Sequence, residues 1–197
     1  MKPNIILIGG GGHCKSCIDV IERANEFKIA GIVDRNLSME NLFGYSLLGN
    51  DNDLSKLKEK YEYALITIGQ IKSSAIRIKL FDQTKSLGFK LPSIISPRAY
   101  VSKHAILGEG NIIMHDALVN AGATVGNNCI INTKALIEHD AIVGDHCHIS
   151  TGSIVNGGAN IRCGSFVGSN AITKEYVISR EFDFIEAGSL FRGYEND

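Results

Sequence analysis

The stretch ALIEHDAIVGDHCHISTGS, residues 135–153, carries an aliphatic residue at every sixth position, at Ile137, Val143 and Ile149. The same period runs without a break through residues 95–172. Its thirteen aliphatic positions are Ile95, Val101, Leu107, Ile113, Val119, Val125, Ile131, Ile137, Val143, Ile149, Val155, Ile161 and Val167. A period of six fits neither an amphipathic helix nor an alternating hairpin. It is the signature of a hexapeptide β-helix.

Small residues recur four positions after these aliphatic ones at nearly every step, as Ala117, Cys129 and Cys147 illustrate. Three hexapeptides form one triangular coil of about 18 residues, with the aliphatic side chain inside and the small one at a tight corner. Stacked coils then pair backbone to backbone along the axis. We expect roughly four coils, with the repeat stopping after Ile172. Cys129 and Cys147 are then small buried side chains.

Residues 1–91 have a different pattern, in which short apolar runs alternate with helical periodicity. The pattern predicts strands at 4–9, 29–34 and 63–69, and helices at 14–27, 54–61 and 73–88. This order implies a small parallel sheet with ligand sites at the carboxyl ends of its strands. The predicted fold is an α/β N-terminal domain with a Rossmann-like sheet, residues 1–91. An all-β left-handed parallel β-helix with a C-terminal closing segment follows, residues 92–197.

The composition excludes several function classes. A formal net charge of −1 leaves no basic footprint for nucleic acid and no polybasic patch for a membrane. No apolar run approaches the roughly 18 residues of a transmembrane helix, and the apolar start of the chain is too short for a signal peptide. Five irregularly spaced cysteines fit reduced thiols, and the C-x-x-C pair Cys14 and Cys17 lacks thioredoxin-like surroundings. We therefore expect a cytoplasmic protein without nucleic-acid or membrane partners.

Three motifs accompany the hexapeptide repeat: GGGGH at 9–13, IVD at 32–34 and IEHDAIVGDHCHISTGS at 137–153. In this combination the chain resembles the NeuD/PglD-like sugar acetyltransferases, which belong to the hexapeptide-repeat acyltransferases. The resemblance implies an acetyl-CoA-dependent N-acetyltransferase that acts on a nucleotide-linked 4-amino-deoxy sugar in surface-glycan biosynthesis. It also implies a homotrimer, with acetyl-CoA in the groove between neighbouring β-helices.

His139 and Asp140 stand side by side in the third motif. A neutral imidazole, with a pKa of about 6.5, accepts a proton at neutral pH, and an adjacent carboxylate fixes its tautomer and raises its basicity. The resemblance makes His139 the general base, Asp140 its supporting acid and the backbone N–H of Gly157 a donor to the oxyanion. No cysteine or serine is paired with this base, so we expect direct transfer without an acyl-enzyme.

The glycine-rich loop between the first strand and the first helix lets backbone amides approach a phosphate at a helix N-terminus. The full dinucleotide fingerprint fails, because Cys14 stands where a glycine is required. The resemblance assigns this loop, with Gly11, Gly12 and His13, to the diphosphate and sugar of a nucleotide-linked sugar.

Two further segments complete the expected substrate site. Asp34 ends the second strand, where an acid can bind ribose hydroxyls or a base edge. The resemblance brings the nucleotide close to Gly69, at the end of the third strand. Arg35 departs from the two consecutive acids of the bacillosamine-specific relatives, and it offers donors where a carboxylate offers acceptors. The identity of the nucleotide is therefore left open: the analogy favours UDP, and GDP and dTDP are the alternatives.

The expected cofactor contacts come from the resemblance alone. They are His148, the second histidine of the motif, with Gly168, Ser169 and Ala187. The segment IEAGSLFRG at 185–193 resembles the closing strand that packs over the cofactor in the family, with Leu190 in place of its proline.

Zinc binding is the main alternative use of the histidines. The γ-class carbonic anhydrases also have a left-handed β-helix, and they bind zinc through three histidines across a trimer interface. The spacing of His139, His146 and His148 does not resemble that pattern, so we expect no metal. His146 is then interpreted as a solvated polar residue, and His115 as a surface or subunit-interface residue.

Two other functions remain open. One is O-acetylation of a sialic-acid-like sugar on the same scaffold, which hydroxyl and amine acceptors would distinguish in an assay. The other is a non-catalytic trimer that binds nucleotide sugars, which a lack of acetyl-CoA binding would support.

Overall fold

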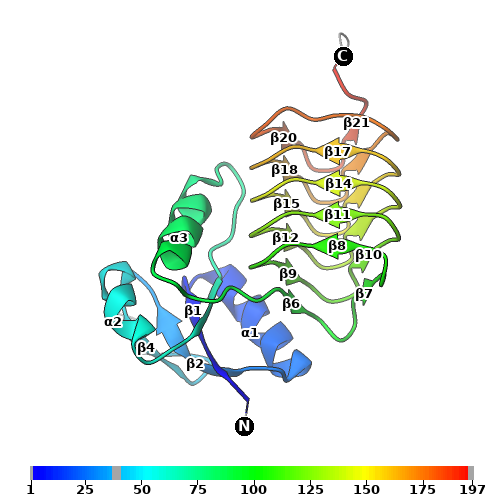
Figure 1. The fold of residues 1–197 in the computed structure, drawn as a ribbon. Coiled ribbons are helices and arrows are strands. Elements are labelled where there is room, and N and C mark those ends of the chain that lie inside the picture. Colours follow the sequence, from blue (N-terminus) through cyan, green and yellow to red (C-terminus); the bar gives the residue numbers. More distant parts are fainter. Residues whose placement is uncertain (1, 37–40, 195–197) are drawn as a thin grey trace.

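The computed structural model describes residues 2–36 and 41–194, and it has an N-terminal α/β region followed by a β-helix (Figure 1). The α/β region is a five-stranded sheet in the order β3-β4-β2-β1-β5, parallel except for the β3–β4 hairpin. Its strands are β1 Asn4–Ile8, β2 Lys28–Val33, β3 Asn41–Leu42, β4 Tyr45–Gly49 and β5 Tyr63–Ile66. Its helices are α1 Gly12–Ala24, α2 Leu54–Lys58, α3 Ala75–Ser86 and the short 3-10 helix η1 Asp51–Asp53.

The strands and helices expected for this region are confirmed, with ends that shift by a few residues. The β3–β4 hairpin was not predicted. Its strands are half-buried or exposed and carry no continuous apolar run, so they give no periodic signal. None of the helices in residues 2–36 and 41–194 is long and apolar enough to cross a membrane.

The β-helix is a left-handed triangular prism of three parallel sheets, which we call faces 1, 2 and 3. Face 1 contains β6 Ile94–Ile95, β9 Ile112–Ile113, β12 Ile130–Ile131, β15 His148–Ile149, β18 Phe166–Val167 and β20 Phe184–Ile185. Face 2 contains β7 Tyr100–Val101, β10 Leu118–Val119, β13 Leu136–Ile137, β16 Ile154–Val155, β19 Ile172–Thr173 and β21 Leu190–Phe191. Face 3 contains β8 Ile106–Leu107, β11 Thr124–Val125, β14 Ile142–Val143 and β17 Asn160–Ile161.

The residues that recur every six positions fill the interior of the prism, as predicted. The second residue of each strand points inward, and the aliphatic series from Ile113 to Val167 forms one continuous buried core with the small corner residues. Cys129 and Cys147 are fully buried at corners, as expected. Paired strands are one coil apart, as Ile131 opposite Ile149 illustrates.

The expected end of the repeat at Ile172 is wrong, because the prism continues to Phe191. In the additional coil the inward positions are taken first by Thr173 and Ser179, which are buried, and then by Ile185. Their hydroxyls accept backbone N–H groups of the coil below, at 2.9 Å from Asn156 for Thr173 and 2.8 Å from Arg162 for Ser179. A polar residue is therefore tolerated inside the prism when its hydroxyl is hydrogen-bonded. For this reason the β-helix continues past the point where the aliphatic pattern ends.

The α/β region packs against face 1 (Figure 1). The outward residues of its lower strands, Ile94, Ile112 and Ile130, form one buried cluster with Cys17 and Ile18 of α1. Face 1 is therefore apolar on both sides in its lower half, because one side meets the prism core and the other meets α1.

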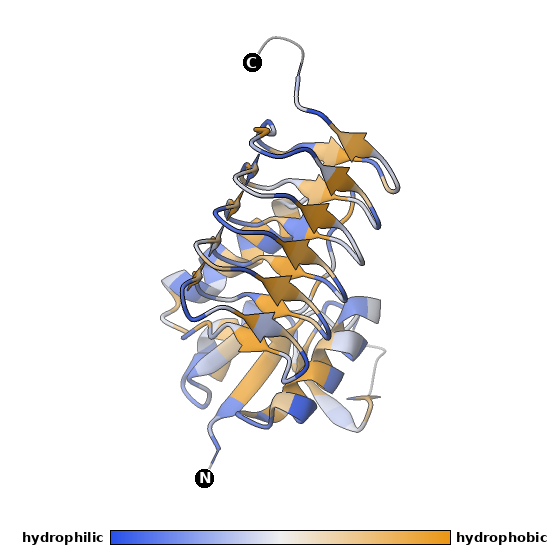
Figure 2. Cartoon of the chain, turned by 90° about the vertical axis from the view of Figure 1, so that its right-hand side faces the viewer, coloured by the Kyte–Doolittle hydropathy of each residue, from blue (hydrophilic) through white to orange (hydrophobic). Residues whose placement is uncertain are grey.

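Face 2 has an apolar exterior that no part of the described chain covers. Its outward residues are Tyr100, Leu118, Leu136, Ile154, Ile172 and Leu190, which are half-buried or exposed. Figure 2 looks at the prism from this side, where the strands form a ladder of mainly hydrophobic residues. A stack of six aliphatic or aromatic side chains on one face indicates an interaction surface.

Candidate active site

His139 and Asp140 lie at the corner between faces 2 and 3, in the turn from β13 to β14. Asp140 has a positive φ of 57°, which turns its carboxylate back toward the histidine. The Nδ1 of His139 lies 2.9 Å from Oδ2 of Asp140, so that nitrogen donates its proton and Nε2 is the free base. This hydrogen bond raises the pKa of His139, whose side chain is 58% exposed.

Gly157 lies directly beside this imidazole, one coil further along the prism. A Cβ placed on Gly157 would come 2.8 Å from Nε2 of His139, so a larger residue would displace the ring. Within the described residues, the backbone N–H of Gly157 donates to no acceptor. The free Nε2 thus lies beside Gly157, whose N–H has no acceptor, and we call this place, together with Asp140, the outer corner.

Sequence reasoning missed one residue of the outer corner. Gly122 lies one coil before Asp140, and a Cβ on it would collide with Oδ1 of that carboxylate. Its φ of +75° also favours glycine. A glycine 18 residues before the acid was the available signal, since one coil separates stacked positions.

The predicted nucleotide site lies at the carboxyl ends of the parallel strands. Helix α1 begins after Gly11 without a side-chain cap, and the space at Gly11 and Gly12 is open within 4 Å. The first turn of α1 carries no acidic residue, so the N–H groups of Gly12 and His13 remain available to an anion. Asp34 accepts the backbone N–H groups of Gly10 at 2.5 Å and Asn36 at 2.7 Å, which fixes its carboxylate beside the glycine loop.

His13 and Gly69 meet behind the glycine loop. A Cβ on Gly69 would lie 3.4 Å from the Cβ of His13, so these two residues lie side by side, while a nucleotide close to Gly69 stays a prediction. Burial, followed by the charge of Arg77, lowers the pKa of His13 to about 3. Its Nε2 is buried without a partner among the described residues. His13 is therefore a neutral imidazole with one unused nitrogen.

His148 lies at the contact between the α/β region and face 1, which we call the junction. Its Nδ1 donates to the backbone oxygen of Gln70 at 2.5 Å, and its Nε2 accepts from Asn132 at 3.0 Å. Burial lowers the pKa of His148 to about 4. Both ring nitrogens are thus engaged within the chain. A contact of His148 with a cofactor stays a prediction.

The other predicted cofactor residues stack along the corner between faces 1 and 2. The Ser169 hydroxyl is 3.0 Å from that of Ser150, one coil below. A Cβ on Gly168 would collide with the backbone of Ala187, one coil above. These residues flank one edge of face 2, while His139 flanks the other. Within one chain the structure therefore does not bring the base to the cofactor or nucleotide residues.

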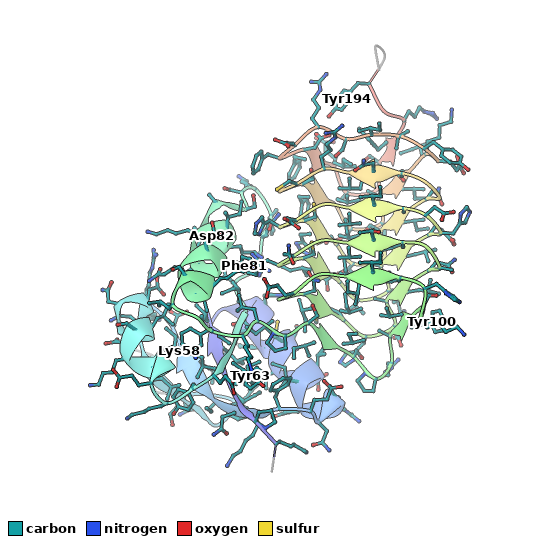
Figure 3. All side chains as sticks on the ribbon, in the orientation of Figure 1. Lys58, Tyr63, Phe81, Asp82, Tyr100 and Tyr194 are labelled. Carbon is teal, nitrogen blue, oxygen red and sulfur yellow. The ribbon has the colours of Figure 1, made fainter. Side chains whose placement is uncertain are left out.

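Two interpretations of the remaining histidines are wrong. His146 is half-buried at the junction, where its Nδ1 accepts from Asn128 at 3.0 Å. Its ring makes a T-shaped contact with Phe81, which α3 carries on the side of the prism (Figure 3). His115 lies between the two regions, with Nε2 2.6 Å from Asp19 of α1 and Nδ1 2.6 Å from the hydroxyl of Ser96. Both histidines join the α/β region to the prism, so neither is simply a solvated or subunit-interface residue.

Cys14 and Cys17 are buried in α1, and burial raises the pKa of Cys14 to about 11 and that of Cys17 further. Both stay protonated thiols, which are poor nucleophiles and poor metal ligands. In residues 2–36 and 41–194, no group of three or more His, Cys, Asp or Glu side chains could hold a metal ion.

Residues 4–84 match the family model of the PglD N-terminal domain. No curated protein matches the chain by sequence. Among solved structures, the acetyltransferase domain of PglB from Neisseria gonorrhoeae FA1090 is 26% identical with a TM-score of 0.91, over 100% of this chain and 94% of that chain. The same domain in complex with acetyl coenzyme A matches with a TM-score of 0.83, over 96% and 88% of the two chains.

PerB from Caulobacter crescentus, in complex with CoA and GDP-perosamine, is also 26% identical. Its TM-score is 0.68, and the match covers 95% of this chain and 92% of that chain. The matches span both the α/β region and the prism, so they concern the whole architecture. Residues 4–84 therefore resemble a PglD-type N-terminal domain, and the chain is an acetyltransferase whose whole architecture is similar to that of NeuD/PglD-like sugar acetyltransferases.

Proposed function

We propose that this protein transfers the acetyl group of acetyl-CoA to the amino group of a nucleotide-linked 4-amino-deoxy sugar. The observation that carries the proposal is the outer corner, where Nε2 of His139 lies beside Gly157, whose N–H has no acceptor among the described residues, while Asp140 holds Nδ1. The binding of CoA and GDP-perosamine by PerB supports the same pair of substrates here.

In this mechanism the sugar amine attacks the thioester carbonyl directly. The new N–C bond forms as Nε2 of His139 takes the amine proton, and Asp140 stabilises the imidazolium. The N–H of Gly157 donates to the oxyanion of the tetrahedral intermediate. The C–S bond then breaks, and the proton passes from His139 to the departing CoA thiolate. No serine or cysteine among the described residues bonds to His139, which agrees with direct transfer.

We further propose a homotrimer. Burial of the apolar exterior of face 2 against other copies would remove this surface from water. Around a three-fold axis, one edge of each face 2 meets the opposite edge of the next, in a heterologous contact that closes into a ring. His139 of one copy would then approach the corner of Gly168 and Ser169 in the next copy.

The trimer explains why a single chain separates the base from the other predicted residues. The α/β region lies on face 1, and the corner of Gly168 is one edge of that same face. A base supplied by a neighbour across that corner would reach acetyl-CoA in the groove and a sugar held by the glycine loop. Each complete site therefore takes its base from one copy and its nucleotide site from another.

The test is CoA release from acetyl-CoA with a panel of nucleotide-linked 4-amino sugars. His139→Ala is expected to lower kcat by about 10²-fold or more, because general base catalysis contributes that much. His104→Ala is the matched control, since His104 is exposed at the same corner two coils below and should leave the rate unchanged. If turnover survived His139→Ala, His139 would not be the general base. If no amine acceptor were turned over, the proposed N-acetyl transfer would be contradicted.

A further inference from the structure

The carboxyl ends of β1, β2 and β4 lie next to one another in the sheet and form a continuous crevice. A cavity of about 170 Å³ is lined by Gly9, Asp34 and Ile68, and a second of about 550 Å³ by Asn52, Lys79 and Gln83. Two residues line both cavities: Arg35, which follows β2, and Asp51, which follows β4.

Arg35 and Asp51 form an ion pair at the boundary of the two cavities. The Nε of Arg35 donates to Oδ2 of Asp51 at 2.7 Å, and the Asp51 side chain is only 16% exposed. The backbone beneath the carboxylate is fixed, because Gln83 donates to the Asp51 carbonyl at 3.2 Å and Asn50 caps η1. Within the described residues, Oδ1 of Asp51 and the terminal nitrogens of Arg35 bond to nothing. The pair thus presents a free acceptor and free donors toward the crevice.

The order of the strands matches the order of parts in a nucleoside diphosphate. The N-terminus of α1, after β1, suits the phosphates, and Asp34, after β2, suits the ribose hydroxyls. Neighbouring strands are about 4.8 Å apart, so β4 ends about 10 Å from the phosphate loop. The base of a nucleotide bound along this edge therefore falls at Arg35 and Asp51.

The ion pair selects among the bases by its hydrogen bonds. Guanine places two adjacent donors, N1–H and the C2 amino group, beside the acceptor O6, and a carboxylate with a neighbouring guanidinium complements all three. Uracil and thymine have a single N–H between two carbonyl oxygens, so a carboxylate there meets a carbonyl on either side. Adenine carries an unprotonated N1, which also repels a carboxylate.

We propose that the nucleotide is guanosine diphosphate, with Asp51 accepting from N1–H and the C2 amino group and Arg35 donating to O6. The inference rests on the proposed function, whose nucleotide it specifies. Arg35 was expected at this site but with the base left open, whereas Asp51 gave no sequence signal of its own.

The first test is calorimetric binding of GDP, UDP and dTDP to the full-length protein. We expect GDP to bind at least about ten-fold more tightly than the pyrimidine nucleotides, as one bidentate base contact provides. Tighter binding of UDP or dTDP would overturn the guanine assignment and leave the proposed function intact. Failure of all three to bind would contradict the nucleotide-sugar substrate itself, so the two failures are distinguishable.

The second test exchanges one acceptor for a donor. Asp51→Asn keeps an oxygen for Arg35 but presents an amide N–H₂ to the base, so GDP should bind about ten-fold more weakly or worse. The same variant should gain affinity for xanthosine diphosphate, which has a carbonyl where guanine has its C2 amino group. Asp82→Asn, on the exposed face of α3 (Figure 3), is the control and should change neither affinity.

This gain distinguishes base recognition from simple damage, because a misfolded variant would not bind xanthosine diphosphate more tightly. Equal weakening of all nucleoside diphosphates by Asp51→Asn, with an unchanged unfolding temperature, would overturn the assignment of Asp51 to the base.

Discussion

The outer corner holds His139 and the junction holds His148, from the same coil of the prism. The pKa of His139 is raised, whereas the pKa of His148 is lowered. His139 is mostly exposed, and its bond to Asp140 raises its pKa. His148 is buried between the two regions, and the loss of solvent lowers its pKa to about 4. A partner carboxylate favours the imidazolium, whereas burial favours the neutral ring. The residue type alone therefore does not identify the base, because the neighbouring groups decide it.

Hydrogen bonding separates the two histidines as clearly as charge does. His148 uses both ring nitrogens, on Gln70 and Asn132, so it holds the two regions in register. His139 uses only Nδ1 among the ring nitrogens, and its Nε2 faces the backbone of Gly157. For this reason we propose proton transfer at the outer corner, whereas His148 fixes the geometry of the junction.

The largest effect is expected from filling the space beside the base. In Gly157→Ala the new Cβ would lie 2.8 Å from Nε2 of His139, so the ring must leave its position beside Asp140. We expect kcat to fall by about 10³-fold, within the range of losing a general base. The measurement is steady-state CoA release with the best amino-sugar substrate.

Gly44→Ala is the control for a general effect of replacing glycine. Gly44 lies in the β3–β4 turn with a φ of +86° and open space around it, so the substitution strains the backbone without touching either histidine. Its kcat should stay within about two-fold of the parent, because surface changes away from the site are nearly neutral. A Gly157→Ala enzyme of normal rate would contradict the placement of the oxyanion and base at this corner.

At the junction, the lowered pKa of His148 predicts a dependence of stability on pH. The unfolded histidine binds a proton below about pH 6.5, whereas the folded one stays neutral down to about pH 4. The unfolded state therefore holds more protons in this window, and the free energy of unfolding falls as the pH is lowered through it. The full contribution is about 3 kcal/mol.

His148→Gln keeps a donor and an acceptor but removes the titration. Urea unfolding at several pH values should show that the wild type loses about 3 kcal/mol more than this variant between neutral pH and pH 4. The same substitution at the exposed His104 should leave the slope unchanged. If the free energy of unfolding depended on pH in the same way for the wild type and His148→Gln, the junction would not hold a neutral imidazole.

Much of the fold could be predicted because its signal is periodic and local. Every sixth residue from Ile95 to Val167 fills the prism, and each aliphatic position follows from the one before. The last coil could not be found in this way, since Thr173 and Ser179 satisfy their hydroxyls through backbone contacts that no residue pattern encodes. The β3–β4 hairpin was missed for a related reason, because its strands lack an apolar run.

The candidate site was predictable where its residues are neighbours in sequence or one coil apart. His139 and Asp140 are adjacent, and Gly157 stacks on them through the regular geometry of the prism. The junction was not predictable, because its contacts join residues about 50 to 100 positions apart, as Arg77 with Asn128 and Asp19 with His115 illustrate. His146 was misread for this reason, since α3 covers it only in the folded chain.

The smallest expected effect concerns the cause of the raised pKa at the outer corner. A general base must be neutral to act, so the activity should fall as the pH drops through the pKa of His139. Asp140→Asn weakens the hydrogen bond and removes the charge that together raise this pKa, so the acid limb of kcat/KM should move to lower pH. The plateau at higher pH should fall by about ten-fold, because the amide supports the imidazolium less well.

Asp116→Asn is the matched control for this shift. Asp116 also has a positive φ at a corner of the prism, but its carboxylate pairs with Arg98 at 2.8 Å and touches neither histidine. The acid limb should stay in place in this variant. If Asp140→Asn left the limb unmoved as well, the group titrating in the rate would not be His139. The outer corner and the junction would then no longer differ in the way that assigns catalysis to one and packing to the other.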